Sequence, residues 1–117
     1  MAPRIELLWW EGCPSTERAL ADLRAAMTDA GVEGDVDLRE IRSDAEAIAE
    51  GFAGSPTIVL DGVELTALLG RAEDDAEAAG LNCRVYRRRD GRISPTPDPL
   101  DLREALAMVT TRGAVRP

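Results

Sequence analysis

The sequence predicts one α/β domain over residues 1–117, with a central mixed sheet of about four strands flanked by helices. Apolar runs of strand length alternate with stretches whose apolar residues recur at every third or fourth position, the spacing of a helix with one buried face. A strand, a helix, a strand and a helix in this order form a unit with two parallel strands and a right-handed crossover. We find no internal repeat and no second domain in the pattern.

The first half of the chain supplies this unit. We expect a strand at residues 4–10, a helix at residues 15–30 and a second strand at residues 36–41. Gly31 stands where a left-handed residue usually ends a helix. Ser43 and Glu46 have the spacing of a capping box, which predicts the start of a second helix. The residues expected on the inward face of this second helix are Ala45, Ile48, Ala49 and Phe52.

The second half is expected to return to the sheet. Pro56 begins a β-branched strand to residue 60, because a strand tolerates proline at its first position. Residues 63–81, rich in Ala and acidic side chains, predict a partly helical and mobile insertion before a last long strand at residues 83–89. Asp90-Gly91 predicts a tight turn, with residues 92–94 as the returning partner.

A final helix closes the predicted domain. Asp98 is expected to cap it, with Pro99 at the first helical position, where a missing N–H costs nothing. Gly113 is expected to end the helix. The residues expected on its core face are Leu102, Leu106 and Val109.

Composition excludes several classes of function. The net charge is −8, which argues against nucleic acid and anionic membrane surfaces as partners. All 14 basic residues are Arg, and the absence of His removes Cys–His and Ser–His catalysis and most zinc-enzyme chemistry. We therefore expect no metal and no cofactor. With two cysteines, no apolar segment of membrane-spanning length and no cleavable leader in the pattern, we expect a cytoplasmic protein.

The strongest chemical signal is Cys13, which we expect between the first strand and the first helix. At a helix N-terminus the free backbone N–H groups and the dipole favour a thiolate, which is the nucleophilic form of cysteine. Pro14 suits the first helical turn, and Ser15 and Thr16 can offer hydrogen-bond donors to the sulfur. The charge of Glu11 opposes this effect. A buried structural cysteine is the alternative interpretation.

Two local motifs carry a resemblance to the thioredoxin-like superfamily. Trp10-Glu11-Gly12-Cys13-Pro14-Ser15-Thr16 stands where those proteins keep their Trp and Cys-x-x-Cys, and Gly54-Ser55-Pro56-Thr57 stands where they keep a cis-proline loop. With residues 83–86 before the last helix, the pattern resembles a group of small bacterial thioredoxin-like proteins, some of which are labelled alkylmercury lyase. The resemblance covers nearly the full length and implies a thioredoxin fold.

The resemblance also implies a redox-active cysteine, with one departure. Thr16 replaces the second cysteine, so the usual disulfide within the motif cannot form, and a monothiol mechanism is implied. Cys13, Thr16 and Pro56 take the catalytic positions, with Pro56 expected in the cis form. The residues implied in substrate binding are Trp10, Pro14, Ser15, Ser55 and Thr57. Trp9 and Trp10 alternate sides on the strand, and we expect Trp10 to border the site.

Two further features of the sequence each allow two interpretations. Cys83 is either a second thiol that resolves Cys13 or an apolar strand residue, and the strand direction makes a direct bridge the minority option. The five arginines near the last strand either bind an anion or acidic partner, or form a solvated face that pairs with residues 73–77. These arginines are Arg84, Arg87, Arg88, Arg89 and Arg92.

Three hypotheses of function follow. The first is a thiol-disulfide oxidoreductase that acts on a small-thiol or protein disulfide through Cys13. The second is a non-catalytic thioredoxin-like binding module, supported by the missing second cysteine. The third is thiolate-based handling of soft metals or organomercurials, which needs either the sulfurs of Cys13 and Cys83 near each other or a dimer. Nothing in the sequence indicates an oligomeric state.

Overall fold

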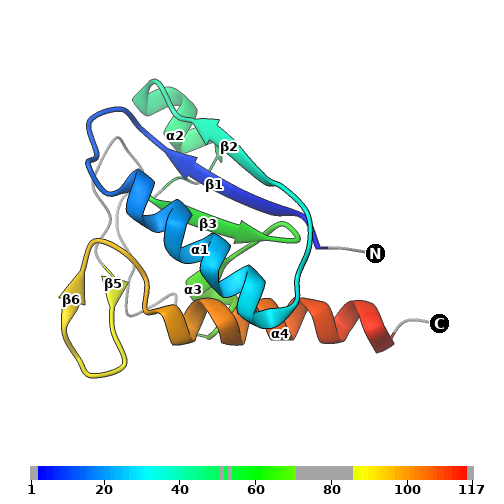
Figure 1. The fold of residues 1–117 in the computed structure, drawn as a ribbon. Coiled ribbons are helices and arrows are strands. Elements are labelled where there is room, and N and C mark those ends of the chain that lie inside the picture. Colours follow the sequence, from blue (N-terminus) through cyan, green and yellow to red (C-terminus); the bar gives the residue numbers. More distant parts are fainter. Residues whose placement is uncertain (1–2, 51, 53, 71–85, 116–117) are drawn as a thin grey trace.

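The computed structural model describes residues 3–50, 52, 54–70 and 86–115. These residues form a mixed α/β arrangement with a four-stranded mixed sheet, a separate two-stranded sheet and four helices (Figure 1). The strand order in the larger sheet is β2-β1-β3-β4. The predicted class and the predicted size of the central sheet are confirmed.

The βαβ unit of the first half is confirmed. Strand β1 (Ile5–Trp9) leads to helix α1 (Thr16–Ala30) and then to strand β2 (Val36–Glu40), which pairs with β1 in parallel. Gly31 ends α1 with a left-handed φ of 70° and donates its backbone N–H to the carbonyl of Thr28. Since a side chain is strained in this conformation, glycine is favoured at this helix end.

The third and fourth strands complete the larger sheet. Strand β3 (Thr57–Leu60) pairs with β1 in the antiparallel direction, and strand β4 (Val63–Glu64) turns back on β3. Helix α3 (Leu65–Leu68) follows directly, and its amides are capped by the Glu64 carboxylate. The predicted insertion at residues 63–81 is therefore wrong at its start, because β4 supplies the fourth strand of the sheet. Its remainder lies outside the described residues.

The predicted last long strand is also corrected. Its described part, strand β5 (Tyr86–Arg87), pairs with strand β6 (Ile93–Ser94) in a hairpin separate from the larger sheet. The tight turn is confirmed, since the Gly91 N–H donates to the Arg88 carbonyl at 2.9 Å. The four charged side chains of residues 87–90 favour this exposed hairpin over a buried strand of the sheet.

Helix α4 (Pro99–Val115) begins as predicted and ends later. The carboxylate of Asp98 accepts the backbone N–H of Leu100 at 2.9 Å, so the predicted cap is confirmed. Leu102, Leu106 and Val109 are buried, as expected. The prediction that Gly113 ends the helix is wrong, because a glycine inside a helix costs only about 1 kcal/mol relative to alanine.

Helix α2 (Asp44–Glu50) opens as predicted but faces the sheet differently. The Glu46 N–H donates to Ser43 Oγ at 3.1 Å, which is half of the expected capping box. Ala47 is the buried residue of the helix, whereas Ile48 is 67% exposed. The inward face predicted from Ala45, Ile48 and Ala49 is therefore wrong. Of that set only Phe52, which follows the helix, is buried.

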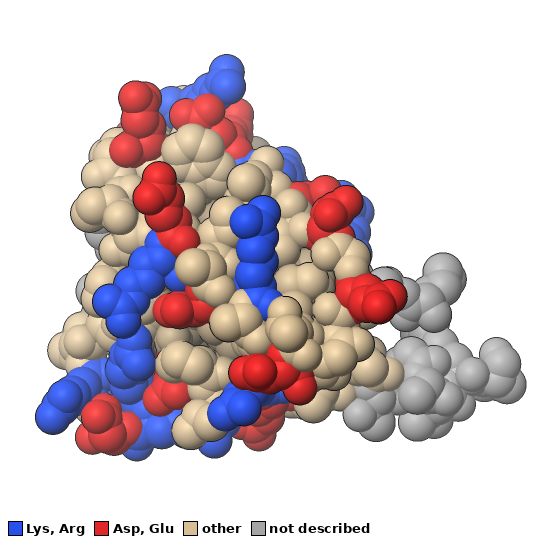
Figure 2. All heavy atoms as spheres, viewed as in Figure 1, with Lys and Arg blue, Asp and Glu red and all other residues tan. Residues whose placement is uncertain are grey.

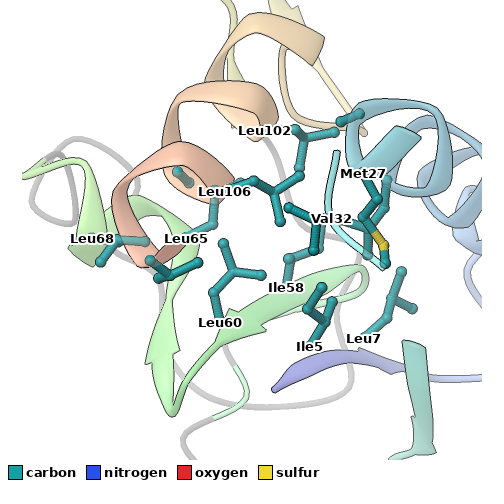
Figure 3. Close-up of a cluster of buried hydrophobic side chains, with 14 of the residues drawn as sticks. Ile5, Leu7, Met27, Val32, Ile58, Leu60, Leu65, Leu68, Leu102 and Leu106 are labelled. Atoms are coloured by element: carbon teal, nitrogen blue, oxygen red, sulfur yellow. The ribbon is translucent and has the colours of Figure 1, made fainter. Parts of the chain in front are cut away.

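The hydrophobic core is divided between the two faces of the sheet. On one face α1 and α4 pack together over β1 and β3 and bury most of the large aliphatic side chains (Figures 1 and 3). We call this the major cluster; its labelled members in Figure 3 are Ile5, Leu7, Met27, Val32, Ile58, Leu60, Leu65, Leu68, Leu102 and Leu106. The minor cluster, on the other face, consists of Leu8, Ile41, Ala47 and Phe52.

The surface carries charges of both signs. Acidic and basic side chains are interspersed on the face seen in Figure 2, so the excess negative charge does not gather there. Within the part of the chain that the structure describes, no helix has the length and the apolar character to cross a membrane.

Candidate functional site

Cys13 lies in the turn that joins β1 to α1. Its backbone N–H donates to the Trp10 carbonyl at 3.1 Å, which closes the turn three residues before α1 begins. The residue is only 6% exposed. Gly12 and Pro14, on either side of it, are exposed. The thiol is thus held under the surface of an exposed turn, close to the start of a helix.

The Pro56 loop, residues 54–57, lies against this thiol. Cys13 Sγ donates to the Ser55 carbonyl oxygen at 3.3 Å, although the two residues are 42 positions apart. Strand pairing explains the contact. Leu8 is paired with Thr57 in the antiparallel register, so β3 begins beside the end of β1. The Ser55-Pro56 peptide bond is cis, and the Thr57 hydroxyl donates to the Gly54 carbonyl within the loop.

Two buried hydroxyl groups near the motif have no hydrogen-bond partner among the described residues. They are Thr16 Oγ1, three positions after the cysteine, and Ser55 Oγ. Ser55 itself is fully buried. A buried hydroxyl without a partner costs about 1–3 kcal/mol, so each of these groups is available to a ligand atom or to a sulfur that has lost its proton. The Thr16 hydroxyl therefore makes no hydrogen bond to the thiol in this structure.

Trp10 packs against the turn from the minor-cluster side. A Cβ atom at Gly12 would overlap carbon atoms of the Trp10 ring, so the indole occupies the space that a side chain at Gly12 would need. The tryptophan is half-buried and also packs on the minor cluster. Trp9 packs instead on the major cluster. The two side chains thus lie on opposite faces of the sheet.

An open depression of about 680 Å³ adjoins the turn. The charged side chains around it carry a net negative charge. Arg42 Nε is paired with the Glu40 carboxylate at 3.1 Å, and Glu11 adds a second carboxylate. Cys13 is not part of its wall. The depression is lined by Trp10, Glu11, Gly12, Glu40, Ile41 and Arg42.

The remaining predicted site residues are placed as follows. Pro14 is exposed and Ser15 half-buried before the first turn of α1, and the Ser15 side chain makes no capping hydrogen bond. Pro56 and Thr57 are buried in the loop. Cys83, and with it the question of a second thiol, lies outside the described residues. Among the residues that are described, no group of three or more His, Cys, Asp or Glu side chains is arranged to hold a metal ion.

Sequence reasoning missed Tyr86. Its side chain is 2% exposed, and its hydroxyl donates to the carbonyl of Pro56, in the loop that faces Cys13. The available signal was compositional, because Tyr86 is the only tyrosine in a chain with 3% aromatic residues. A buried tyrosine hydroxyl usually has a hydrogen-bond partner.

The arginines of the β5–β6 hairpin are partly engaged. Arg89 Nε donates to the Asp101 carboxylate at 2.8 Å, and the same guanidinium pairs with Glu104. Arg88 donates to the Thr96 hydroxyl at 3.5 Å. The predicted partners at residues 73–77 and Arg84 lie outside the described residues. The described contacts favour a structural role for Arg89.

Asp98 has a shifted acidity. Its burial alone raises the pKa of the carboxyl, but hydrogen bonds from the backbone N–H groups of Arg89 and Leu100, with the nearby Arg88 and Arg89 charges, outweigh burial and lower the pKa. The carboxylate is therefore held ionised where the hairpin meets the first turn of α4.

Comparisons of the chain with protein-family models, with curated proteins and with solved structures find no match. Function is therefore inferred from the geometry around Cys13.

Proposed function

We propose that the protein is a thioredoxin-like thiol-disulfide oxidoreductase that acts by a monothiol mechanism through Cys13. The observation that carries the proposal is the contact of Cys13 Sγ with the Ser55 carbonyl, 3.3 Å away, in the residue before Pro56. A cysteine at a strand-to-helix turn and a proline loop at the start of an antiparallel strand are thereby brought together. A thiol there can react with an extended substrate that binds along the loop.

The order of elements supports the thioredoxin-like assignment of the fold. A βαβ unit is followed by a strand antiparallel to β1, a further antiparallel strand and a terminal helix packed on α1. The short fourth strand and the separate hairpin are the departures from the pattern that the sequence suggested.

The reaction has two steps. The Cys13 thiolate attacks one sulfur of a disulfide, a new S–S bond forms on Cys13, and the second sulfur leaves as a thiolate that takes up a proton. A small-molecule thiolate then attacks the mixed disulfide, forms a disulfide with the bound sulfur and releases the Cys13 thiolate. The cytoplasm that we expect as its location would supply this small thiol.

The site residues have separate roles in this scheme. When Cys13 loses its proton, its hydrogen bond to the Ser55 carbonyl is also lost, because a thiolate has no hydrogen to donate to an acceptor. The free hydroxyl of Thr16 is then a donor within the same motif, and the α1 N-terminus adds its dipole. Trp10 borders the approach from the depression beside the turn.

The test is the trapping of a mixed disulfide. The wild type, Cys13→Ser and Cys83→Ser are incubated with a labelled small disulfide and examined by intact-protein mass spectrometry. We expect a one-to-one adduct on Cys13 in the wild type and in Cys83→Ser, and reduction of the substrate when a small thiol is added. An adduct confined to Cys83, or turnover that persists in Cys13→Ser, would refute the mechanism.

One observation favours the non-catalytic alternative. Cys13 is 6% exposed and its thiol already donates to the Ser55 carbonyl, so little of the sulfur is open to a substrate. A binding module would use the same loop and depression without chemistry. Full function of Cys13→Ser in cells would favour this second candidate. Soft-metal handling needs Cys83 near Cys13 or a dimer, and tight one-to-one mercury binding that is lost in Cys83→Ser would support it.

A further inference from the structure

Pro56 is held from outside its own loop. The hydroxyl of Tyr86 donates to the Pro56 carbonyl, and both residues are buried. The two positions are 30 residues apart, so the bond joins the β5–β6 hairpin to the start of β3. Figure 1 shows the hairpin at the end of the molecule where β1 ends and β3 begins.

The neighbouring carbonyl in the same loop accepts the thiol of Cys13. Ser55 and Pro56 are adjacent, and their two carbonyl oxygens have different partners, Cys13 Sγ and the Tyr86 hydroxyl. Between the two carbonyls lie the planar Ser55-Pro56 peptide bond and the Pro56 Cα, and the proline ring fixes φ, so ψ of Pro56 is the only soft torsion that separates them. The position of the acceptor next to the sulfur therefore depends on the tyrosine.

The hairpin that carries Tyr86 is itself anchored. The backbone N–H of Arg89 donates to the Asp98 carboxylate at 3.0 Å, and the Arg89 side chain bonds Asp101 at 2.8 Å. Asp98 and Asp101 are both buried at the start of α4, which packs on α1. Tyr86 is also a member of the major cluster. Tyr86 is thus held by the anchored hairpin and by the major cluster, in addition to its hydrogen bond to the loop.

We propose that Tyr86 is a positioning residue that sets the Pro56 loop, and with it the Ser55 carbonyl, against the thiol of Cys13. The inference rests on the proposed function for its use in catalysis, but the positioning itself is a property of the free protein. The hydroxyl acts through the loop and does not touch the reacting sulfur. Its removal loosens the carbonyl that the thiol donates to, so that the sulfur is less well covered.

The variant Tyr86→Phe tests this while keeping the ring in the core. We expect alkylation of Cys13 by iodoacetamide at pH 7, measured in Cys83→Ser to isolate one thiol, to become about fivefold faster, the factor that corresponds to a hydrogen bond of ordinary net strength. The value of kcat/KM for disulfide reduction should fall in the same variant, since the loop beside the reacting sulfur is no longer fixed. An unchanged alkylation rate would overturn the proposal.

The matched control is Ser94→Ala, which removes another buried hydroxyl from the same hairpin. Ser94 Oγ contacts the Thr96 backbone N–H and hydroxyl. A general loosening of the hairpin would accelerate alkylation in both variants, whereas positioning by Tyr86 predicts acceleration in Tyr86→Phe alone. Equal acceleration in the two would refute the specific role. The urea midpoints of both variants show whether the two substitutions lower the free energy of unfolding by similar amounts.

A measurement on unsubstituted protein covers the case in which Tyr86→Phe does not fold. Fluorotyrosine labels one position, because the chain has a single tyrosine. We expect its ¹⁹F resonance to shift when Cys13 is alkylated, and no shift would contradict the connection. If the wild type reduces no disulfide, the proposed function fails, while the alkylation and ¹⁹F results still decide the positioning role of Tyr86.

Discussion

The two faces of the four-stranded sheet are packed unequally. The major cluster lies under α1 and α4 and holds most of the large buried side chains, whereas the minor cluster has four buried members beside one short helix. Trp10 packs on the minor cluster and against Gly12, next to Cys13. Tyr86, on the other hand, belongs to the major cluster. The candidate site is thus supported from both faces, by tryptophan on one and tyrosine on the other.

The largest expected effects come from truncating one side chain in each cluster. Leu106→Ala and Phe52→Ala each remove a fully buried side chain and should cost about 3 kcal/mol of unfolding free energy, measured by urea titration. Only Phe52→Ala should also change the Trp10 emission, recorded in a Trp9→Phe background. A change of that emission in Leu106→Ala would show that the two clusters are not separate supports.

A smaller effect is expected at the turn itself. Gly12→Ala places a methyl group where the Trp10 ring lies, and such overpacking costs about 2 kcal/mol. Since the ring must move outward, its emission should shift to longer wavelength in the Trp9→Phe background. Gly34→Ala is a control for the emission: its positive φ makes alanine costly there, but no atom lies within 4 Å of the added Cβ, so the Trp10 emission should not shift. An unshifted emission in Gly12→Ala would contradict the packing.

The charge on Asp98 gives a pH-dependent prediction for the major-cluster side. Asp98→Asn keeps an oxygen for the cap and should cost about 1 kcal/mol at pH 7. The pKa of this carboxyl is lower in the folded protein than its ordinary value of 3.8, so its contribution is present above that value and is lost as pH falls through the folded pKa. The stability difference from the wild type should narrow below about pH 4. A stability difference between the wild type and Asp98→Asn that does not change with pH would exclude the ionised carboxylate as its cause.

The smallest effect tests the corrected face of α2. Ile48→Ser should change stability by less than about 0.5 kcal/mol, because the side chain is 67% exposed. Ala47→Val, one position away and fully buried, should be destabilising by about 1 kcal/mol or more. Thermal unfolding of both variants distinguishes the two faces, and the reverse order of effects would restore the face predicted from the sequence.

The elements with several agreeing local signals could be predicted from the sequence. Helix α1 has a long apolar period and a glycine at its end, and the start of α4 has both a capping aspartate and a proline. Helix α2 has only seven residues, and in two turns the spacing of Ala and Ile fits more than one face. The pattern wrongly favours Ile48 over Ala47 because isoleucine is the more hydrophobic residue. The buried position of this short helix instead holds the methyl group of Ala47.

The candidate site was predictable only in part. Cys13 and the Pro56 loop could be named from local motifs, because each is a short stretch of sequence. The contacts that hold them were not predictable, since the ring of Trp10 over Gly12 and the bond from Tyr86 to Pro56 depend on side-chain directions in the folded chain. The sequence pattern predicts that the residues around Tyr86 form a strand of the central sheet. In that position the tyrosine would not be expected near the Pro56 loop.

The contact between Cys13 and Ser55 makes the single described thiol a reporter of folding order. Cys13 follows β1 directly, but its partner lies beyond β2 and α2, and becomes a neighbour only when β3 pairs with β1. Pulsed alkylation during refolding would therefore time this long-range antiparallel pairing at one atom. A thiol that becomes protected late, after helical circular dichroism has recovered, would mark the β1–β3 pairing as the slow step of a chain whose helices form from local contacts.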